Sequence, residues 1–240
     1  GTTMSAKAHF SGIIPILITT YDEAGRIDHD SLETLIDFNI SAGVHAIGVA
    51  LGSELFKFSE AERDELISRV VRHTDKRVPI IINTSASGTS LCVELSQGAQ
   101  RLGADAVMVY PPFMMNTGQS ASVAHYRAVA SAIEIPVILQ DIPQAPVSAA
   151  MALELAKESE SIRTIKVETL PTVPQVGTMV KKAGDTLTVI GGAGGSYMIE
   201  EYRRGARGVM PFCSQPGAFV AVWKLLEAGQ ELEARRLFDS

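Results

Sequence analysis

The sequence predicts an α/β protein folded as a (β/α)8 barrel, on three observations. Eight apolar runs with strand composition alternate with amphipathic, helix-like stretches at intervals of about 25 to 30 residues, which implies parallel pairing. The length of 240 residues is close to the roughly 250 of a typical barrel. No Pro/Gly/Ser-rich linker divides the chain. A doubly wound open sheet is the alternative, but no Gly-x-Gly-x-x-Gly follows the first run, which disfavours it.

The strand candidates are rich in Val and Ile, which favour a pleated, buried surface. Three of them follow a glycine placed just after a helix-like stretch (Gly43, Gly103 and Gly205), as expected for the left-handed residue that ends a helix. The candidates lie at 13–18, within 41–50, at 79–82, within 101–110, at 136–140, at 162–167, at 187–190 and within 203–212. Three serines stand where caps are expected to begin helices: Ser31, Ser59 and Ser120.

Three parts are expected along the chain. Residues 1–8 form an N-terminal tail, whose first three residues, ahead of Met4, have the character of an expression remnant. The barrel is expected over 9–228, and residues 229–240 begin a C-terminal helical extension.

The composition is that of an ordinary soluble globular protein and excludes several functions. Hydrophobic residues make up 46% and charged residues 20%, with a net charge of −6 and no basic stripe, so neither a nucleic-acid nor a membrane partner is expected. No apolar run reaches the roughly 18 residues of a membrane helix, and no signal-peptide pattern begins the chain, which favours a cytoplasmic protein. Cys92 and Cys213 lack CxxC or Cys/His spacing, and no Asp/Glu/His set has metal spacing, so no metal is expected.

The stretch "TIKVET" places two charges in a strand candidate. Lys166 and Glu168 are two residues apart, so on a strand they share a face. Facing outward, both would press into the apolar helix layer at high cost. Facing inward near the strand's C-terminal end, they would lie at the mouth where barrel enzymes carry out chemistry. A strand that ends at Ile165, with both charges solvated in a loop, is equally compatible with the pattern.

Five motifs in combination carry a family resemblance. They are "GIIPILITTYDEAGRID" (12–28), "GVALGSELFKFSEAERDELI" (48–67), "GADAVMVYPPF" (103–113), "IPVILQDIP" (135–143) and "IRTIKVE" (162–168). Together they resemble the dihydrodipicolinate synthase and N-acetylneuraminate lyase family over nearly the whole chain. The resemblance implies a (β/α)8 barrel in which Lys166 attacks the ketone of a 2-oxo acid, without a cofactor, in a homotetramer or dimer. The family's C-terminal helical segment runs further than this chain does.

The departures from the family pattern narrow the prediction. Gln140 stands where most of the family has the fifth-strand tyrosine, and a second tyrosine is replaced around Met114. The carboxylate-binding arginine of true synthases falls near Ala145, and the Gly-Thr-Thr-Gly-Glu segment is reduced to "ALGSE" at 50–54. These losses argue against the lysine-pathway activity. "LQDIP", "GSE" and "IKVET" instead resemble the branch that dehydrates 2-keto-3-deoxy sugar acids, notably L-2-keto-3-deoxyarabonate dehydratase.

The predicted chemistry begins with an imine between Lys166 and the C2 ketone, which makes the C3 proton acidic. Glu168 is the predicted base, and once protonated it assists the leaving C4 hydroxyl. Because a carboxylate beside the amine favours the charged ammonium, Glu168 is expected either to be held off the amine or to carry the proton. Gln140 is expected to orient the substrate or a water. The predicted substrate-binding residues are Gly52, Ser53, Gly191 and Met210.

Two classes of function stay open at this point. The favoured class is a Schiff-base lyase, either a 2-keto-3-deoxy sugar acid dehydratase or, as an alternative, a 2-keto acid aldolase. The other class is a non-catalytic barrel that binds 2-oxo acids.

Overall fold

The computed structural model describes residues 4–114 and 118–240, and within them the chain forms a closed parallel barrel. The strands are β1 (Gly12–Ile13), β2 (Ile47–Val49), β3 (Ile80–Asn83), β4 (Ala106–Val109), β5 (Val137–Asp141), β6 (Thr164–Val167), β7 (Thr188–Gly194) and β8 (Gly208–Pro211). Their order in the sheet is β1-β8-β7-β6-β5-β4-β3-β2. Ile16 closes the ring because it bridges both Gly48 on β2 and Phe212 just past β8. The predicted (β/α)8 barrel is confirmed, and the open doubly wound sheet is wrong.

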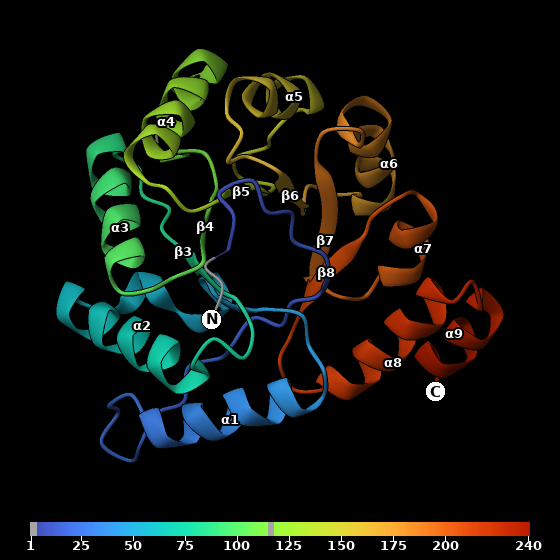
Figure 1. The fold of residues 1–240 in the computed structure, drawn as a ribbon, viewed down its shortest axis with the longest axis horizontal. Coiled ribbons are helices and arrows are strands. Elements are labelled where there is room, and N and C mark those ends of the chain that lie inside the picture. Colours follow the sequence, from blue (N-terminus) through green and yellow to red (C-terminus); the bar gives the residue numbers. More distant parts are fainter. Residues whose placement is uncertain (1–3, 115–117) are drawn as a thin grey trace.

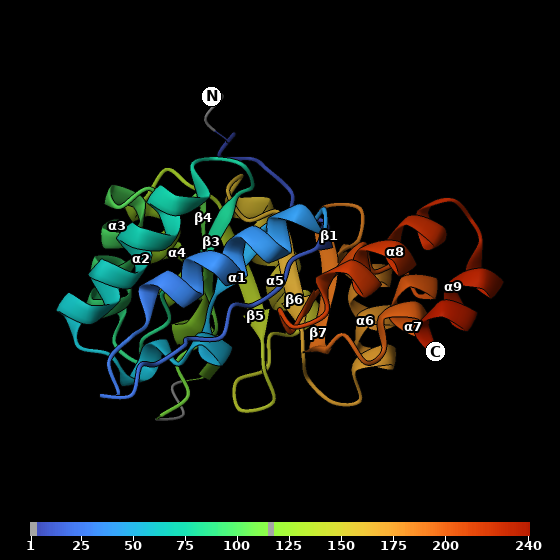
Figure 2. The same cartoon turned by 90° about the horizontal axis from the view of Figure 1, so that it is seen from below.

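Helices surround the barrel in chain order, as Figure 1 shows. The described α-helices are α1 (His29–Ser41), α2 (Glu60–Thr74), α3 (Thr89–Arg101), α4 (Gly118–Ala132), α5 (Ala149–Glu158), α6 (Thr172–Ala183), α7 (Met198–Arg203), α8 (Pro216–Glu227) and α9 (Glu231–Phe238). Two short 3-10 turns, η1 (Leu51–Ser53) and η2 (Leu55–Lys57), follow β2. Helix α9 lies outside the ring beside α8 (Figures 1 and 2) and is tied to α7 by Arg235 Nη2, 2.6 Å from Glu200 Oε1. It falls in the stretch 229–240, where a helical extension was expected.

Two apolar layers hold the barrel together. The layer inside it consists of Phe10, Ile14, Ile16, Ala46, Ala50, Ile81, Ala106, Met108, Ile138, Ile190 and Met210. The outer layer lies between strands and helices, and β6 contributes Ile165 and Val167 to it. Because side chains alternate along a strand, Thr164 and Lys166 then face inward. The Thr164 hydroxyl accepts a hydrogen bond from the Phe10 N–H at 3.0 Å, near the N-terminal end of the strands. Both charges of "TIKVET" are therefore on the inward side.

The serine caps show where sequence pattern alone succeeds and where it fails. Ser59 does cap α2, and its side chain and that of Glu62 satisfy each other's backbone N–H groups. The prediction for Ser31 is wrong, because Asp28 caps α1 and accepts hydrogen bonds from both the N–H and the hydroxyl of Ser31. The prediction for Ser120 is also wrong, since α4 already begins at Gly118.

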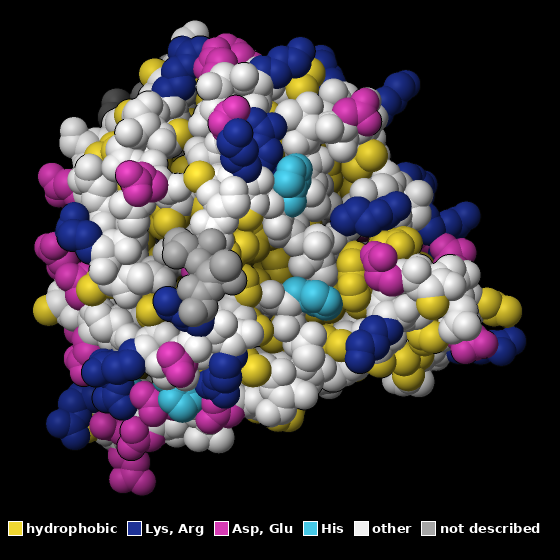
Figure 3. All heavy atoms as spheres, viewed as in Figure 1, with side chains coloured by type: hydrophobic (Ala, Val, Ile, Leu, Met, Phe, Trp, Pro, Cys, Tyr) yellow, Lys and Arg dark blue, Asp and Glu magenta, His cyan; other side chains and the backbone are white. Residues whose placement is uncertain are grey.

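The surface carries no sign of a polyanionic partner on the face that Figure 3 displays. Acidic and basic side chains are interspersed there around the rim, in keeping with the formal net charge of −6. Across residues 4–114 and 118–240, no helix combines the length and the apolar character needed to cross a membrane.

The reciprocal cap on α2 predicts a measurable stability difference. Ser59→Ala removes the acceptor for the Glu62 N–H and is expected to lower the free energy of unfolding by about 1 kcal/mol. Ser120→Ala is the matched control, because Ser120 is exposed inside α4 and alanine favours helix. Urea denaturation measures both changes. An equal loss in the two variants would show that the cap contributes nothing specific.

Candidate active site

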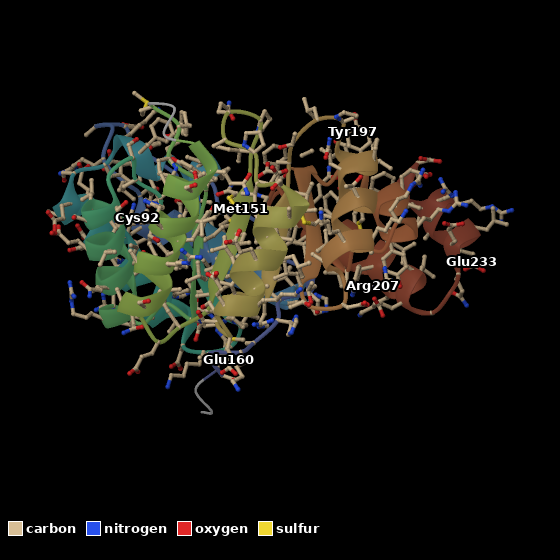
Figure 4. All side chains as sticks on the ribbon, turned by 90° about the horizontal axis from the view of Figure 1, so that it is seen from above. Cys92, Met151, Glu160, Tyr197, Arg207 and Glu233 are labelled. Carbon is tan, nitrogen blue, oxygen red and sulfur yellow. The ribbon has the colours of Figure 1, made fainter. Side chains whose placement is uncertain are left out.

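A cavity of about 360 Å³ opens where the strands end, at their C-terminal edge. Figure 4 helps to locate this edge: Tyr197, just past β7, lies on one side of the molecule, and Glu160 and Arg207, which precede β6 and β8, lie on the opposite side. The cavity is lined by Ile16, Ile18, Ala50, Leu51, Gly52, Gln140, Ile142, Pro143, Gln144, Lys166, Glu168, Ala193, Gly194, Met210, Pro211 and Phe212. This is the end of a (β/α)8 barrel at which active sites occur.

Lys166 and Glu168 form an ion pair inside the mouth of the barrel. Lys166 is 5% exposed, and its Nζ lies 3.2 Å from Glu168 Oε1. Strand β6 continues to Val167, so the alternative in which it ends at Ile165 and leaves two solvated loop charges is wrong. Glu168 is in contact with the amine and is not held away from it.

Gln140 completes a hydrogen-bonded group with this pair. Its Nε2 donates to Glu168 Oε1 at 3.1 Å, and its Oε1 accepts from Asn83 Nδ2 at 2.7 Å. The two contacts fix which way the Gln140 amide points, because each of its ends has one possible role. The sequence-based prediction did not include Asn83, although it is a polar residue at the end of the apolar run "IIIN". In the structure Asn83 is 5% exposed. Arg63 Nη2 in turn donates to the Asn83 carbonyl at 2.8 Å.

Two adjacent glycines on β7 face opposite sides of the barrel wall. A Cβ on Gly192 would lie 2.7 Å from Lys166 Cε and 2.8 Å from Glu168 Cγ, so only glycine leaves room for the pair. Gly191, predicted to bind substrate, faces the other way: a Cβ there would lie 2.5 Å from Glu201 Oε2. Gly192, next to the predicted Gly191, is thus the glycine that faces Lys166 and Glu168.

The other predicted binding residues are divided between the cavity and the loop behind it. Gly52 and Met210 line the cavity with Lys166. The hydroxyl of Ser53 points into the loop, where it donates to the Leu17 carbonyl and accepts from the Ala50 N–H at 3.1 Å. A substrate carboxylate at this loop would accordingly meet backbone N–H groups of η1. Substrate binding by these residues stays a prediction.

Glu201, on α7, is a buried carboxyl that the sequence did not identify. It is 1% exposed, and among the described residues neither carboxyl oxygen has a hydrogen-bond partner. Burial, with a smaller contribution from the charge of Glu168 across β7, raises the pKa of Glu201 to about 7. Glu201 is thus expected to be protonated below neutral pH.

No metal site is evident in the described part of the chain. Within residues 4–114 and 118–240, no three His, Cys, Asp or Glu side chains converge as a metal ion would require.

Together, the fold and the site define a class of protein: a (β/α)8 barrel with a buried lysine that contacts a glutamate carboxylate at the C-terminal mouth. The chain belongs to the dihydrodipicolinate synthetase family, whose model matches residues 9–239. The family resemblance found in the sequence is confirmed.

Individual relatives differ in activity. L-2-keto-3-deoxyarabonate dehydratase of Azospirillum brasilense is 31% identical over 191 residues, which covers 77% of this chain and 62% of that protein. The 4-hydroxy-tetrahydrodipicolinate synthase of Aquifex aeolicus is 30% identical over 207 residues, covering 84% and 69%. The structure of YagE, a prophage protein of the dihydrodipicolinic acid synthase family from E. coli K12 in complex with pyruvate, superimposes with a TM-score of 0.89 at 27% identity, covering 97% and 80%. The chain thus spans about three fifths of the length of the dehydratase.

The raised pKa of Glu201 predicts how stability depends on pH. The unfolded chain releases this proton near pH 4.5 and the folded chain near 7, so the free energy of unfolding falls as pH rises through that interval. Glu201→Gln removes the dependence. Relative to wild type, it is expected to gain about 2–3 kcal/mol between roughly pH 5 and pH 8.

Glu200→Gln is the matched control for that measurement. The Arg235 guanidinium lowers the pKa of Glu200, so its ion pair is intact at both pH values and its loss costs the same at each. Denaturation of the three proteins at the two pH values gives the comparison. A difference between Glu201→Gln and wild type that does not change with pH would contradict the assignment.

Proposed function

We propose that this chain is a Schiff-base lyase that dehydrates a 2-keto-3-deoxy sugar acid through an imine on Lys166. The observation that carries the proposal is the 3.2 Å contact between Lys166 Nζ and Glu168 Oε1 inside the barrel mouth. The nucleophile and the base for the adjacent carbon are then supplied by one strand. The similarity to L-2-keto-3-deoxyarabonate dehydratase of Azospirillum brasilense supports the choice of reaction.

The resting ion pair is compatible with a nucleophilic lysine because it holds one transferable proton. Passing that proton from the ammonium to Glu168 leaves a neutral amine and a carboxylic acid in contact. The amine attacks the C2 carbonyl, one of its N–H protons passes to the carbonyl oxygen, and the acid returns its own proton to the same oxygen, which leaves as water. The products of this step are the iminium and the Glu168 carboxylate, ready to act as a base.

Dehydration then follows at C3 and C4. The Glu168 carboxylate removes the C3 proton, and the electron pair moves into the enamine. The enamine expels the C4 hydroxyl, which leaves as water with the proton from Glu168. Hydrolysis of the unsaturated iminium by one water releases the product and regenerates Lys166. Over the cycle the substrate loses one water, and no oxidant, reductant or cofactor enters.

The charges in the cavity favour a substrate with a single carboxylate. Lys166 and Glu168 are the charged side chains among its described lining residues, so no arginine is present there to bind a second carboxylate. Ala145, at the position where the family resemblance places that arginine, is 6% exposed and closes a turn with Ile142. This supports a sugar acid over the two-carboxylate adduct of a synthase. A homo-oligomeric state, which the family resemblance implies, and a cytoplasmic location, which the sequence pattern favours, belong to the proposal.

A 2-keto acid aldolase is the second candidate. The 4-hydroxy-tetrahydrodipicolinate synthases among the relatives favour it, because they are similar to this chain to nearly the same degree as the dehydratase. Cleavage needs a base at the C4 hydroxyl, which the family resemblance assigns to a tyrosine at the position of Gln140. An amide is not a base, so the residues present favour dehydration.

Imine formation predicts a covalent product that mass spectrometry detects. Borohydride reduction in the presence of pyruvate is expected to add one reduced pyruvate to the peptide that contains Lys166. Lys166→Ala should lose the label, whereas Lys157→Ala, which alters an exposed lysine on α5, should keep it. Label that persists in Lys166→Ala would assign the nucleophile elsewhere.

The role of Glu168 predicts a separation of imine formation from turnover. Glu168→Gln keeps the shape but removes the base, so trapping should survive while turnover of 2-keto-3-deoxy sugar acids falls by about 10²-fold or more. Wild type should release water and exchange the C3 proton without forming pyruvate and an aldehyde. Glu154→Gln on α5 serves as the surface control. Pyruvate accumulation would favour the aldolase, and trapping with no turnover of any sugar acid would favour a binding barrel.

A further inference from the structure

Four hydrogen-bond donors surround the side chain of Asp141, the residue after Gln140. Asp141 is the last residue of β5, it is 2% exposed, and strand alternation directs its side chain away from the barrel interior. Oδ1 accepts from the Val147 N–H at 2.8 Å and from the Thr169 hydroxyl at 2.6 Å. Oδ2 accepts from the Thr169 N–H at 2.9 Å and from the Glu168 N–H at 3.3 Å. Four donors thus converge on one buried carboxylate.

Three of these donors belong to the segment that carries the predicted base. Strand β6 ends at Val167, so the regular ladder stops one residue before Glu168. The Glu168 N–H extends the ladder by one bond, to the Asp141 carbonyl at 3.0 Å. Beyond that point the side chain of Asp141 takes over from its backbone and holds the Glu168–Thr169 peptide. The direction in which Glu168 leaves the strand is therefore fixed from the outer face of the barrel.

The fourth donor ties the same carboxylate to the loop after β5. Val147 follows the turn that contains Ile142, Pro143 and Gln144, all of which line the cavity. The buried side chain of Asp141 therefore fixes two walls of the site relative to each other, the loop after β5 and the turn after β6. Adjacent residues on β5 divide the task, because Gln140 contacts Glu168 inside the barrel while Asp141 holds the backbone of Glu168 from outside.

We infer that Asp141 is the positioning residue for Glu168: it keeps that carboxylate against Lys166, where it serves as base for C3. The inference rests on the proposed function for the role of Glu168, but the placement itself does not. Asparagine cannot fully replace Asp141, because an NH2 group in place of either oxygen faces a backbone N–H that can only donate: that of Val147 at Oδ1 or that of Thr169 at Oδ2. One buried N–H would lose its acceptor in either orientation, and the turn after β6 would move.

The test uses pyruvate in D2O, since exchange of its methyl protons reports proton transfer at C3 for any natural substrate. Asp141→Asn is expected to trap pyruvate with borohydride as wild type does, while methyl exchange slows by about 10²-fold. For a 2-keto-3-deoxy sugar acid, the loss should fall on kcat with little change in KM. Crystal structures of both proteins are expected to show Glu168 displaced from Lys166 Nζ in the variant.

Three further variants separate positioning from general stability. Thr169→Val removes one of the four bonds and should slow exchange by a smaller factor, while Thr169→Ser keeps the hydroxyl and should restore most of the rate. Asp105→Asn neutralises a partly buried carboxylate that accepts a backbone bond of similar length, 2.8 Å from the Ile80 N–H, at the opposite end of the strands. Asp105→Asn is expected to exchange the methyl protons of pyruvate at a rate within about twofold of wild type, even if its melting temperature falls as far as that of Asp141→Asn.

The outcomes distinguish this inference from the proposed function. If wild type neither traps pyruvate nor exchanges its protons, the proposed function fails, and the crystal structures still decide the positioning. Glu168 unmoved in Asp141→Asn, or exchange at the wild-type rate in a folded Asp141→Asn, would overturn the inference. Exchange lost equally in Asp105→Asn would also overturn it, because the effect would then follow stability alone.

Discussion

The contact between Lys166 and Glu168 sets the conditions that the surrounding strands must meet. Bringing an ammonium and a carboxylate out of water costs several kcal/mol per ion unless further hydrogen bonds compensate. Among the described residues, Gln140 supplies such a hydrogen bond: it donates to Glu168 Oε1, the oxygen that also contacts Lys166, and Asn83 holds the Gln140 amide in place. Glu168 remains 24% exposed toward the cavity, so water or a substrate meets the pair from the mouth. The pair is therefore hydrogen-bonded on the side of Gln140 and still open to a ligand from the mouth.

Strand β7 shows how closely charge is packed around this pair. Gly192 leaves space for the lysine and glutamate on the inner side, and Gly191 leaves space for the Glu201 carboxyl on the outer side. The carboxyl groups of Glu168 and Glu201 thus lie on opposite sides of β7, separated by two glycines. The charge of Glu168 contributes to the raised pKa of Glu201. Keeping Glu201 protonated avoids a second buried negative charge.

The alternation of strands and helices in the sequence predicted the barrel, and a spacing of two residues put Lys166 and Glu168 on one face. The pattern left open whether that face was the barrel mouth or a solvated loop, and the family resemblance favoured the mouth. Contacts between strands could not be predicted from the sequence: Asn83 contacts Gln140, 57 residues away, Asp141 contacts Glu168, 27 residues away, and Glu201 lies across β7 from Glu168, 33 residues away. Helix starts failed for a related reason, since Asp28 and Ser31 both suit a cap and only the backbone path decides between them. The exact glycine that approaches the lysine likewise depends on register, which a run of glycines does not define.

In the proposed reaction, the nucleophile and the base stand two residues apart at the end of one strand. Lys166 lies on β6 and Glu168 lies one residue beyond its end, so their spacing depends on the strand and on the bonds that hold the Glu168 N–H to Asp141. Under that proposal, the base stays close to the carbon next to the imine whichever sugar acid is bound, and Gln140 orients Glu168 without accepting a proton. The residues that line the same cavity from the surrounding loops, among them Gly52, Pro143 and Phe212, would then determine which hydroxyl groups are recognised.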